Sequence, residues 1–288
     1  MYLVTIPTRL QPVFASIDKR KDELVALAAD LIRIPTINPP GENYRPCAEF
    51  IGERLRSKGF ATQYIRGEGT LGDCDQYPRI NVIGRHEGKV PGKCVHFNSH
   101  IDVVEVGKGW SVDPFAGVIQ DGRLYGRGAC DMKGGLAASI IAVEALIEMV
   151  PDLPGALEIS GTVDEESGGH GGVAYLAEIG YFSSPRVDHV IIPEPLNVDR
   201  VCIGHRGVWW AEIETLGRIA HGSMPFLGDC AIRHMGALIA RIERDLIPKL
   251  QQKTTEMPVV PKPANASTLN FNSLHGGQGE TQGDSLPA

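Results

Sequence analysis

The sequence lacks the features that mark membrane-spanning, secreted and nucleic-acid-binding proteins. Its most apolar stretch, residues 136–150, is interrupted by Glu144 and Glu148 and is too short to cross a bilayer. The first residues carry no basic start followed by an apolar core, so they do not resemble a signal peptide. Lys and Arg together number 28 against 35 Asp and Glu, a formal net charge of −7. An acidic chain is poorly suited to nucleic-acid backbones or anionic lipid, so we expect no nucleic-acid and no membrane partner.

Paired cysteines are also missing. The six cysteines are widely scattered and none forms a C-x-x-C pair, which argues against a zinc ribbon and against a thiol redox motif. Six in 288 residues is too sparse for a disulfide scaffold, so reduced thiols are expected. There are no internal repeats and no low-complexity tracts. These absences predict a soluble, cytoplasmic, globular protein.

The patterns that are present predict an α/β fold. Apolar residues make up 42% of the chain and charged residues 22%, typical of a globular protein. Strand-like segments alternate with helical patterns along the first two thirds of the chain, which favours a catalytic domain with a mostly parallel central sheet flanked by helices. The expected strands are 79–84, 93–99, 156–163 and 189–193, and the expected helices are 21–34, 46–58, 133–149 and 172–179.

The pattern changes after Gly204. Residues 208–216 alternate like a strand, 229–249 form a helix broken at Pro248, and 268–273 form a short strand. We therefore expect two domains, 1–206 and 207–288, the second being a partial α+β lid and dimerisation domain. So few elements cannot readily bury a core of their own. The polar residues 276–288 would be a tail or, as we favour, lead into a further strand.

Polar residues follow several of the expected strands. In open parallel sheets, ligands bind beyond the carboxyl ends of the strands. One histidine with several carboxylates suits Zn²⁺, Co²⁺ or Mn²⁺. Each residue alone has a plain structural interpretation, such as helix capping by Asp131, but their combination favours a metal site. The residues are His100, Asp102, Asp131, Glu165, Glu166 and Glu194.

Five sequence blocks resemble a known family. They are SHIDVV at 99–104, GVIQDGRLYGRGACDMKGG at 117–135, TVDEESGG at 162–169, PEP at 193–195 and AHGSMP at 220–225. Together they resemble the zinc aminoacylase and exopeptidase family, which includes acetylornithine deacetylase, succinyl-diaminopimelate desuccinylase and related carboxypeptidases. The resemblance extends from about residue 21 to residue 278.

The resemblance implies a role for each residue at the metal site. A complete site would hold two Zn²⁺ ions, with Co²⁺ as a possible substitute. Asp131 would bridge both ions, His100 and Glu194 would complete one, and Glu166 would bind the other. Glu165 would be the general base rather than a ligand.

Asp102 has a supporting role in this scheme. On a strand, Asp102 and His100 point to the same face. Asp102 can therefore accept the proton on the other ring nitrogen of His100 and fix the orientation of that ring.

The resemblance also implies a lid that completes the site. His221 of a partner subunit would stabilise the oxyanion, and Asn270, Gly276 and Gly277 resemble lid residues that help to hold the substrate. The same resemblance implies a homodimer formed through the lid. It also implies a small substrate, either an N-acyl amino acid or a dipeptide. Lys133, in the DMKGG block, is expected to support its loop rather than act as a nucleophile.

The sequence departs from the family pattern at its end. Family members are usually longer, and their last metal-ligating histidine and their carboxylate-binding arginine have no match here. The second metal would keep only Asp131 and Glu166, so we predict at most one tightly bound metal ion per chain.

Two hypotheses follow from this departure. One is a C-terminally truncated chain of a metal-dependent deacylase, or of a dipeptidase or carboxypeptidase of the same family. The other is a catalytically incompetent homologue that acts as a binding or interaction module. The sequence does not specify which acyl group or which amino acid is recognised.

Overall fold

The computed structural model describes residues 6–196, 200–202 and 204–277. The chain divides into two compact units, Met1–Ile203 and Gly204–Ala288. Within the described ranges, no helix combines the length and the apolar character needed to cross a membrane. The predicted domain limits, 1–206 and 207–288, remain a proposal.

The first unit is built on a five-stranded sheet in the order β1-β2-β6-β3-β7. β6, β3 and β7 are parallel to one another, whereas β2 runs antiparallel to both of its neighbours, β1 and β6. The expected α/β fold is confirmed, but the sheet is mixed, and its parallel part is the one that carries the polar residues. The strands are β1 Ala61–Arg66, β2 Ile80–Glu87, β3 Val90–His100, β6 Pro154–Thr162 and β7 His189–Ile191.

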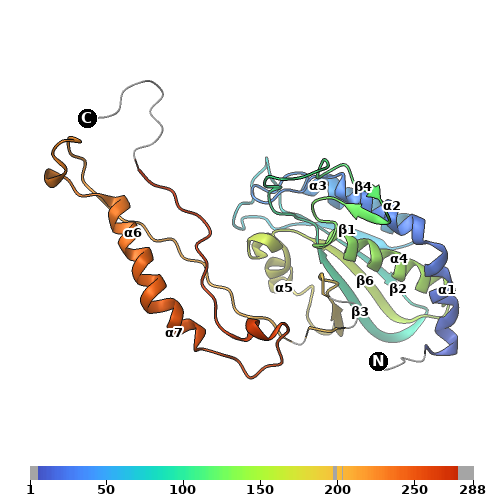
Figure 1. Ribbon diagram of the computed structural model, residues 1–288. Helices are drawn as coiled ribbons and strands as arrows, with labels where there is room; N and C mark the ends of the chain where they lie inside the picture. The colour runs from blue at the N-terminus through green and yellow to red at the C-terminus, as the bar shows by residue number, and fades with distance from the viewer. Residues whose placement is uncertain (1–5, 197–199, 203, 278–288) are drawn as a thin grey trace. The chain divides into compact units, whose positions relative to one another are not determined.

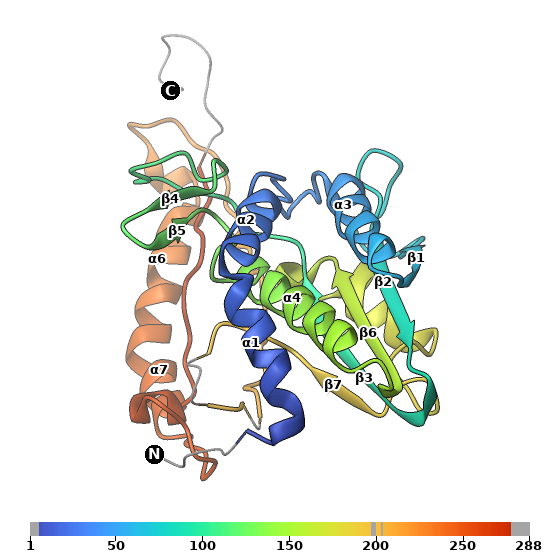
Figure 2. The same ribbon diagram turned by 90° about the vertical axis from the view of Figure 1, so that its right-hand side faces the viewer.

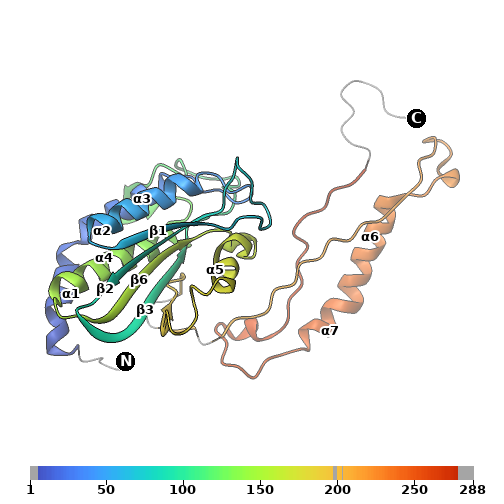
Figure 3. The same cartoon turned by 180° about the vertical axis from the view of Figure 1, so that it is seen from behind.

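Four helices lie together over one face of this sheet (Figure 1). α1 and α2 both pack against α4, as Figure 2 shows. Seen from behind, the strands lie beneath α3 and α4 (Figure 3). The helices are α1 Gln11–Lys19, α2 Lys21–Ile32, α3 Tyr44–Ser57 and α4 Lys133–Met149; the short helix α5 Tyr175–Glu178 and the hairpin β4 Val118–Gln120 and β5 Arg123–Tyr125 complete the unit.

The end of α3 illustrates how the local sequence sets an element boundary. Gly59, with φ of 86°, occupies the left-handed conformation that follows many helices. The Phe60 N–H donates to the Leu55 carbonyl at 3.1 Å and the Gly59 N–H to the Arg56 carbonyl at 3.0 Å. Leu55 and Phe60 are both buried. This is a Schellman motif, and it turns the chain from α3 toward β1.

Between the helices and the sheet lies one apolar core. Side chains of α2, α3 and α4 pack on those of the strands, and burial of each large aliphatic side chain stabilises the fold by roughly 1.5–3 kcal/mol. Leu31, Ile51, Leu136, Ile140 and Ile159 are among its fully buried members.

Alternate residues of β3 and β6 form a second, polar row. In register, His96 faces Glu158, Asn98 faces Ser160 and His100 faces Thr162. His96 Nδ1 lies 2.8 Å from a Glu158 carboxylate oxygen, and His96 Nε2 lies 2.7 Å from the Ser160 hydroxyl. The Ser160 hydroxyl donates to Asn98 Oδ1 at 2.8 Å. Each buried polar group in this row therefore has a partner, and the row ends at His100.

The second unit contains one long helical segment flanked by extended chain (Figure 1). α6 Ala231–Arg241 continues through a π-helical turn, Ile242–Leu246, into α7 Ile247–Gln251. The predicted break at Pro248 is wrong, because the helix continues past this proline to Gln251 and its irregular turn, Ile242–Leu246, comes before the proline.

The strands predicted at 208–216 and 268–273 are also wrong. Neither segment pairs with another in a ladder, and the described part of this unit contains only isolated bridges, Arg218 with Asp229 and Thr254 with Ala266. Alternating side chains produce a strand only when the backbone N–H and C=O groups find a partner strand.

Candidate functional site

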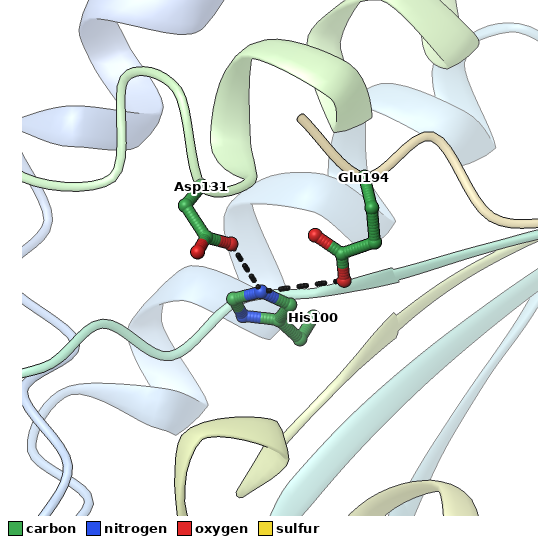
Figure 4. A group of neighbouring side chains, drawn as sticks. All are labelled: His100, Asp131 and Glu194. Carbon is green, nitrogen blue, oxygen red and sulfur yellow. Dashed lines mark hydrogen bonds and ion pairs between the residues drawn. The ribbon is translucent and has the colours of Figure 1, made fainter. Parts of the chain in front are cut away.

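His100, the last residue of β3, is the centre of the candidate site. Its ring is 2% exposed, and its Nε2 atom lies 3.0 Å from Asp131 Oδ1 and 3.7 Å from Glu194 Oε1. Asp131 comes from the loop before α4, and Glu194 follows β7. Both carboxylates point toward the same ring nitrogen (Figure 4).

A second acidic pair approaches His100 from the end of β6. The 3-10 turn Glu165–Ser167 follows this strand, and Glu165 Oε2 lies 3.8 Å from His100 Nε2. Two overlapping groups have their ligand atoms within 4.8 Å of one another: His100 with Asp131 and Glu194, and His100 with Glu165 and Glu166. One imidazole and four carboxylates form a donor set that fits Zn²⁺ or a similar divalent cation.

The electrostatics of this cluster also favour a cation. Burial and the neighbouring Asp131 raise the pKa of Glu166 to about 7. Burial likewise raises the pKa of Glu194 to about 7. For His100, burial alone would lower the pKa, but Asp102, Glu194 and Glu165 raise it to about 10. Four carboxylates are thus held around a single imidazole, and a divalent cation would offset their mutual repulsion.

Asp102 contacts both halves of the site, which are His100 at the end of β3 and the turn Glu165–Ser167 after β6. His100 Nδ1 lies 3.0 Å from the Asp102 main-chain oxygen and 3.5 Å from its carboxylate. The carboxylate also accepts the Glu165 N–H at 3.2 Å and the Glu166 N–H at 3.1 Å. The nearest acceptor for the imidazole proton is therefore the main-chain oxygen, and the Asp102 side chain also holds the turn that carries both glutamates.

A buried ion pair that the sequence patterns did not predict precedes this turn. Asp164, 2% exposed, has a φ of 63° and accepts hydrogen bonds from Arg79 Nε at 3.1 Å and from the Tyr44 hydroxyl at 3.0 Å. Arg79 also donates to the Pro40 carbonyl at 2.8 Å. Arg79 and Tyr44 lie outside all five sequence blocks, so no local signal identified them.

The loop that carries Asp131 is held by contacts of Lys133 with the end of α2. The fully buried Lys133 ammonium donates to the main-chain oxygens of Leu31 at 2.9 Å and Ile34 at 2.8 Å, where α2 ends. The His100 N–H lies 3.1 Å from the Met132 sulfur. Lys133 therefore supports its loop, as predicted, and burial lowers the pKa of its ammonium.

The remaining predicted residues lie in the second unit and are exposed. His221 Nδ1 accepts the Ser223 N–H at 3.2 Å, which leaves Nε2 to carry the proton of the neutral ring. Asn270 and Gly276 lie in the same unit outside any helix or strand, and Gly277 lies at a bend with φ of 99°. The six predicted site residues of the first unit therefore lie together around His100. The other four, His221, Asn270, Gly276 and Gly277, all belong to the second unit.

Comparison with known proteins finds relatives by sequence. The pattern of peptidase family M20/M25/M40 matches residues 96–272. The succinyl-diaminopimelate desuccinylase of Methylobacterium radiotolerans is 35% identical over 231 residues, covering 76% of this chain and 56% of the relative. The enzyme of the same name from Rhodospirillum centenum is 32% identical over 274 residues, covering 87% and 68%. The chain thus spans little more than half the length of the first of these curated relatives.

Solved structures resemble it as well. The dipeptidase Dug1p of Saccharomyces cerevisiae gives a TM-score of 0.62 at 21% identity, covering 86% of this chain and 57% of that one, and supports the fold alone. Human carnosine dipeptidase 1 gives a TM-score of 0.55 at 26% identity, covering 64% and 40%.

Proposed function

The chain belongs to peptidase family M20/M25/M40, and on that premise we propose that the protein is a metal-dependent amidohydrolase that removes the acyl group from an N-acyl amino acid. The observation that carries this proposal is the convergence of four carboxylates on His100. Three of them, Glu165, Glu166 and Glu194, follow the ends of the parallel strands β6 and β7, and the fourth, Asp131, precedes α4. The names of the curated relatives favour a succinyl-diaminopimelate type of substrate, and an acetylornithine type is the second choice.

His100, Asp131 and Glu194 would hold one metal ion, and Asp131 and Glu166 would supply the ligands of a second. When bound, Zn²⁺ or Co²⁺ lowers the pKa of a coordinated water and polarises the acyl carbonyl. The first set has three donors and the second only two, so we expect one tightly bound ion per chain.

Glu165 would act as the general base. Its carboxylate is half exposed and lies beside His100 while its main chain is fixed by Asp102. It can take a proton from the attacking water as the new C–O bond forms. It then delivers that proton to the amine nitrogen as the C–N bond breaks, which yields the free amino acid and a carboxylate.

The second unit would complete the reaction. With Nδ1 occupied by Ser223, His221 can donate its Nε2–H to the oxyanion of the tetrahedral intermediate. By family resemblance, His221 would come from the partner in a homodimer, and Asn270, Gly276 and Gly277 would hold the substrate. A cytoplasmic location is part of the same proposal.

Two alternatives stay open. A dipeptide substrate is favoured by the likeness to human carnosine dipeptidase 1. A catalytically incompetent binding module is favoured by the two-donor set of the second metal. Both alternatives keep the same metal residues and differ in whether and where an amide bond is broken.

Replacing each glutamate of the turn separates these possibilities. The chain should be loaded with Zn²⁺ or Co²⁺ and offered N-succinyl amino acids, N-acetyl amino acids and dipeptides. We expect Glu165→Gln to lower kcat about 10²- to 10⁴-fold without weakening Zn²⁺ binding. Glu166→Gln, the matched control, should lower the amount of metal bound in excess of the first equivalent.

Three results would contradict the proposal. Full activity of Glu165→Gln would remove this residue from its role as base. Two tightly bound ions in metal analysis would contradict the expected stoichiometry. A wild-type chain that binds metal but hydrolyses nothing in the panel would favour the binding module.

A further inference from the structure

Asn38 lies outside all five sequence blocks, yet its side chain joins the two halves of the candidate site. We propose that Asn38 is a positioning residue, which fixes the 3-10 turn Glu165–Ser167 relative to His100. The inference rests on the proposed function for its importance to catalysis, but its geometry is independent of any bound metal.

The Asn38 side chain, 3% exposed, uses both of its amide hydrogens. Nδ2 donates to Asp102 Oδ2 at 3.1 Å and to the Ser167 hydroxyl oxygen at 2.8 Å. Asp102 lies two residues beyond His100, and Ser167 is the last residue of the turn. One amide group therefore ties the end of β3 to the far side of the turn after β6.

The Asp102 carboxylate depends on this donor. It is fully buried and accepts the main-chain N–H groups of Glu165 and Glu166 in addition to the Asn38 amide. A buried carboxylate is tolerated when several N–H groups donate to it. Loss of Asn38 leaves the Asp102 carboxylate with one acceptor position unfilled. It also removes the donor to the Ser167 hydroxyl oxygen, and Ser167 then keeps only its bonds to the Asp164 carbonyl, from the hydroxyl at 3.4 Å and from the N–H at 3.1 Å.

Asn38 is itself held rigidly. Its N–H donates to the Val103 carbonyl at 2.9 Å, and the Val103 N–H donates to the Thr36 carbonyl at 2.9 Å. Ile37 forms a parallel bridge with Val103. Residues 36–38 therefore lie along the segment that leaves β3, and the amide projects from this fixed backbone to the turn.

These contacts distinguish Asn38 from a residue that only fills space. Among the described residues, its side chain hydrogen-bonds to neither His100 nor a glutamate side chain, so it would act through Asp102 and Ser167. If its hydrogen bonds set the turn, a side chain of similar branched shape without donors cannot replace it. If it only packs, such a side chain can.

The test compares Asn38→Leu with Ser160→Ala in the full 288-residue chain. Leu has the same branching and the same number of side-chain heavy atoms as Asn, although it is larger, and it has no donor. Ser160→Ala removes two buried hydrogen bonds, to His96 and Asn98, away from the turn. Two quantities are measured: the Kd for Zn²⁺, by competition with a chromogenic chelator, and amide hydrogen exchange at Glu165 and Glu166 in the metal-free chain.

We expect Asn38→Leu to speed exchange at both amides. Because the Asp102 carboxylate that Asn38 binds also lies beside the ring of His100, we expect the same variant to weaken Zn²⁺ binding about 10- to 100-fold. Ser160→Ala should lower the stability to denaturant and leave both quantities unchanged. Wild-type Kd and wild-type exchange in a folded Asn38→Leu would overturn the proposal. So would equal changes in Ser160→Ala, because the effect would then be general loosening.

Two further measurements cover a variant that does not fold and a chain that does not bind Zn²⁺. If Asn38→Leu does not fold, Ser167→Ala removes only one of the two contacts and should speed exchange at the turn by a smaller factor; wild-type exchange in that variant would overturn the proposal. If the wild-type chain does not bind Zn²⁺, the proposed function fails, but amide exchange in the metal-free variants still decides the role of Asn38.

Discussion

The two units of this chain differ most in what they bury. In Met1–Ile203, side chains of the helices and the strands enclose a continuous apolar core, and even polar residues such as Glu158 and Asp164 are fully covered. In Gly204–Ala288, none of the described residues is buried, and large apolar side chains such as Trp209, Trp210 and Leu216 are exposed.

This contrast shows that an apolar pattern in the sequence leads to a regular helix or strand only where another part of the chain packs against it or pairs with it. The periodicity of 133–149 produced a helix with those bounds because the sheet offers a surface for its apolar face. The alternation of 208–216 produced no strand, because no other described segment pairs with it. A pattern states which side chains are available for burial, and the partner surface determines whether burial occurs.

The largest expected effect is on the buried ion pair of the first unit. We expect Arg79→Met to cost about 3–5 kcal/mol of unfolding free energy, because it leaves the buried Asp164 carboxylate without its cation. The comparison is Arg244→Met in the second unit, where the pair with Asp245 is solvent-exposed and its loss should not be measurable. Urea denaturation followed by circular dichroism measures both. Equal losses of unfolding free energy would show that the buried pair of the first unit and the exposed pair of the second contribute equally to stability.

A smaller difference is expected for apolar truncation. Leu31→Ala should lower the unfolding free energy by about 2–5 kcal/mol, because it opens a cavity among fully buried side chains. Leu216→Ala, at a side chain that is 74% exposed, should change it by no more than about 0.5 kcal/mol. The same denaturation experiment applies. A large loss for Leu216→Ala would reveal that this residue is buried in solution.

The smallest effect concerns acid stability. Burial alone would raise the pKa of Glu158, but hydrogen bonds from His96 and Arg85 hold it below the usual value of 4.5. Because the folded-state pKa is depressed, this stabilisation is present above about pH 4.5 and is lost as the pH falls toward the folded value.

Denaturation at a series of pH values tests this effect. The contribution of one such group has a slope of at most about 1.4 kcal/mol per pH unit. Glu158→Gln should flatten the acid limb of the stability curve of the first unit. An unchanged acid limb would assign the acid sensitivity to other carboxylates.

The sequence allowed prediction of the elements whose signals are local. The strands that carry the site, the helix 133–149 and the end of the predicted helix 46–58 all depend on neighbouring residues. The same is true of the placing of His100, Glu165 and Glu194 at or just after the ends of strands. The antiparallel strand β1 and the partners of Asp164 were missed because they depend on distant contacts. Tyr44 and Asp164 lie 120 positions apart, and no spacing rule connects them.

The register of β3 on β6 has a consequence for folding specificity. Side chains alternate between the two faces of a strand, so a slip of one residue would turn His100 toward the helices and away from its acidic neighbours. The same slip would set Glu158 opposite an aliphatic or aromatic neighbour and deprive it of His96. The paired polar residues of the row therefore favour one register of β3 on β6, the register that places His100 beside the acidic cluster.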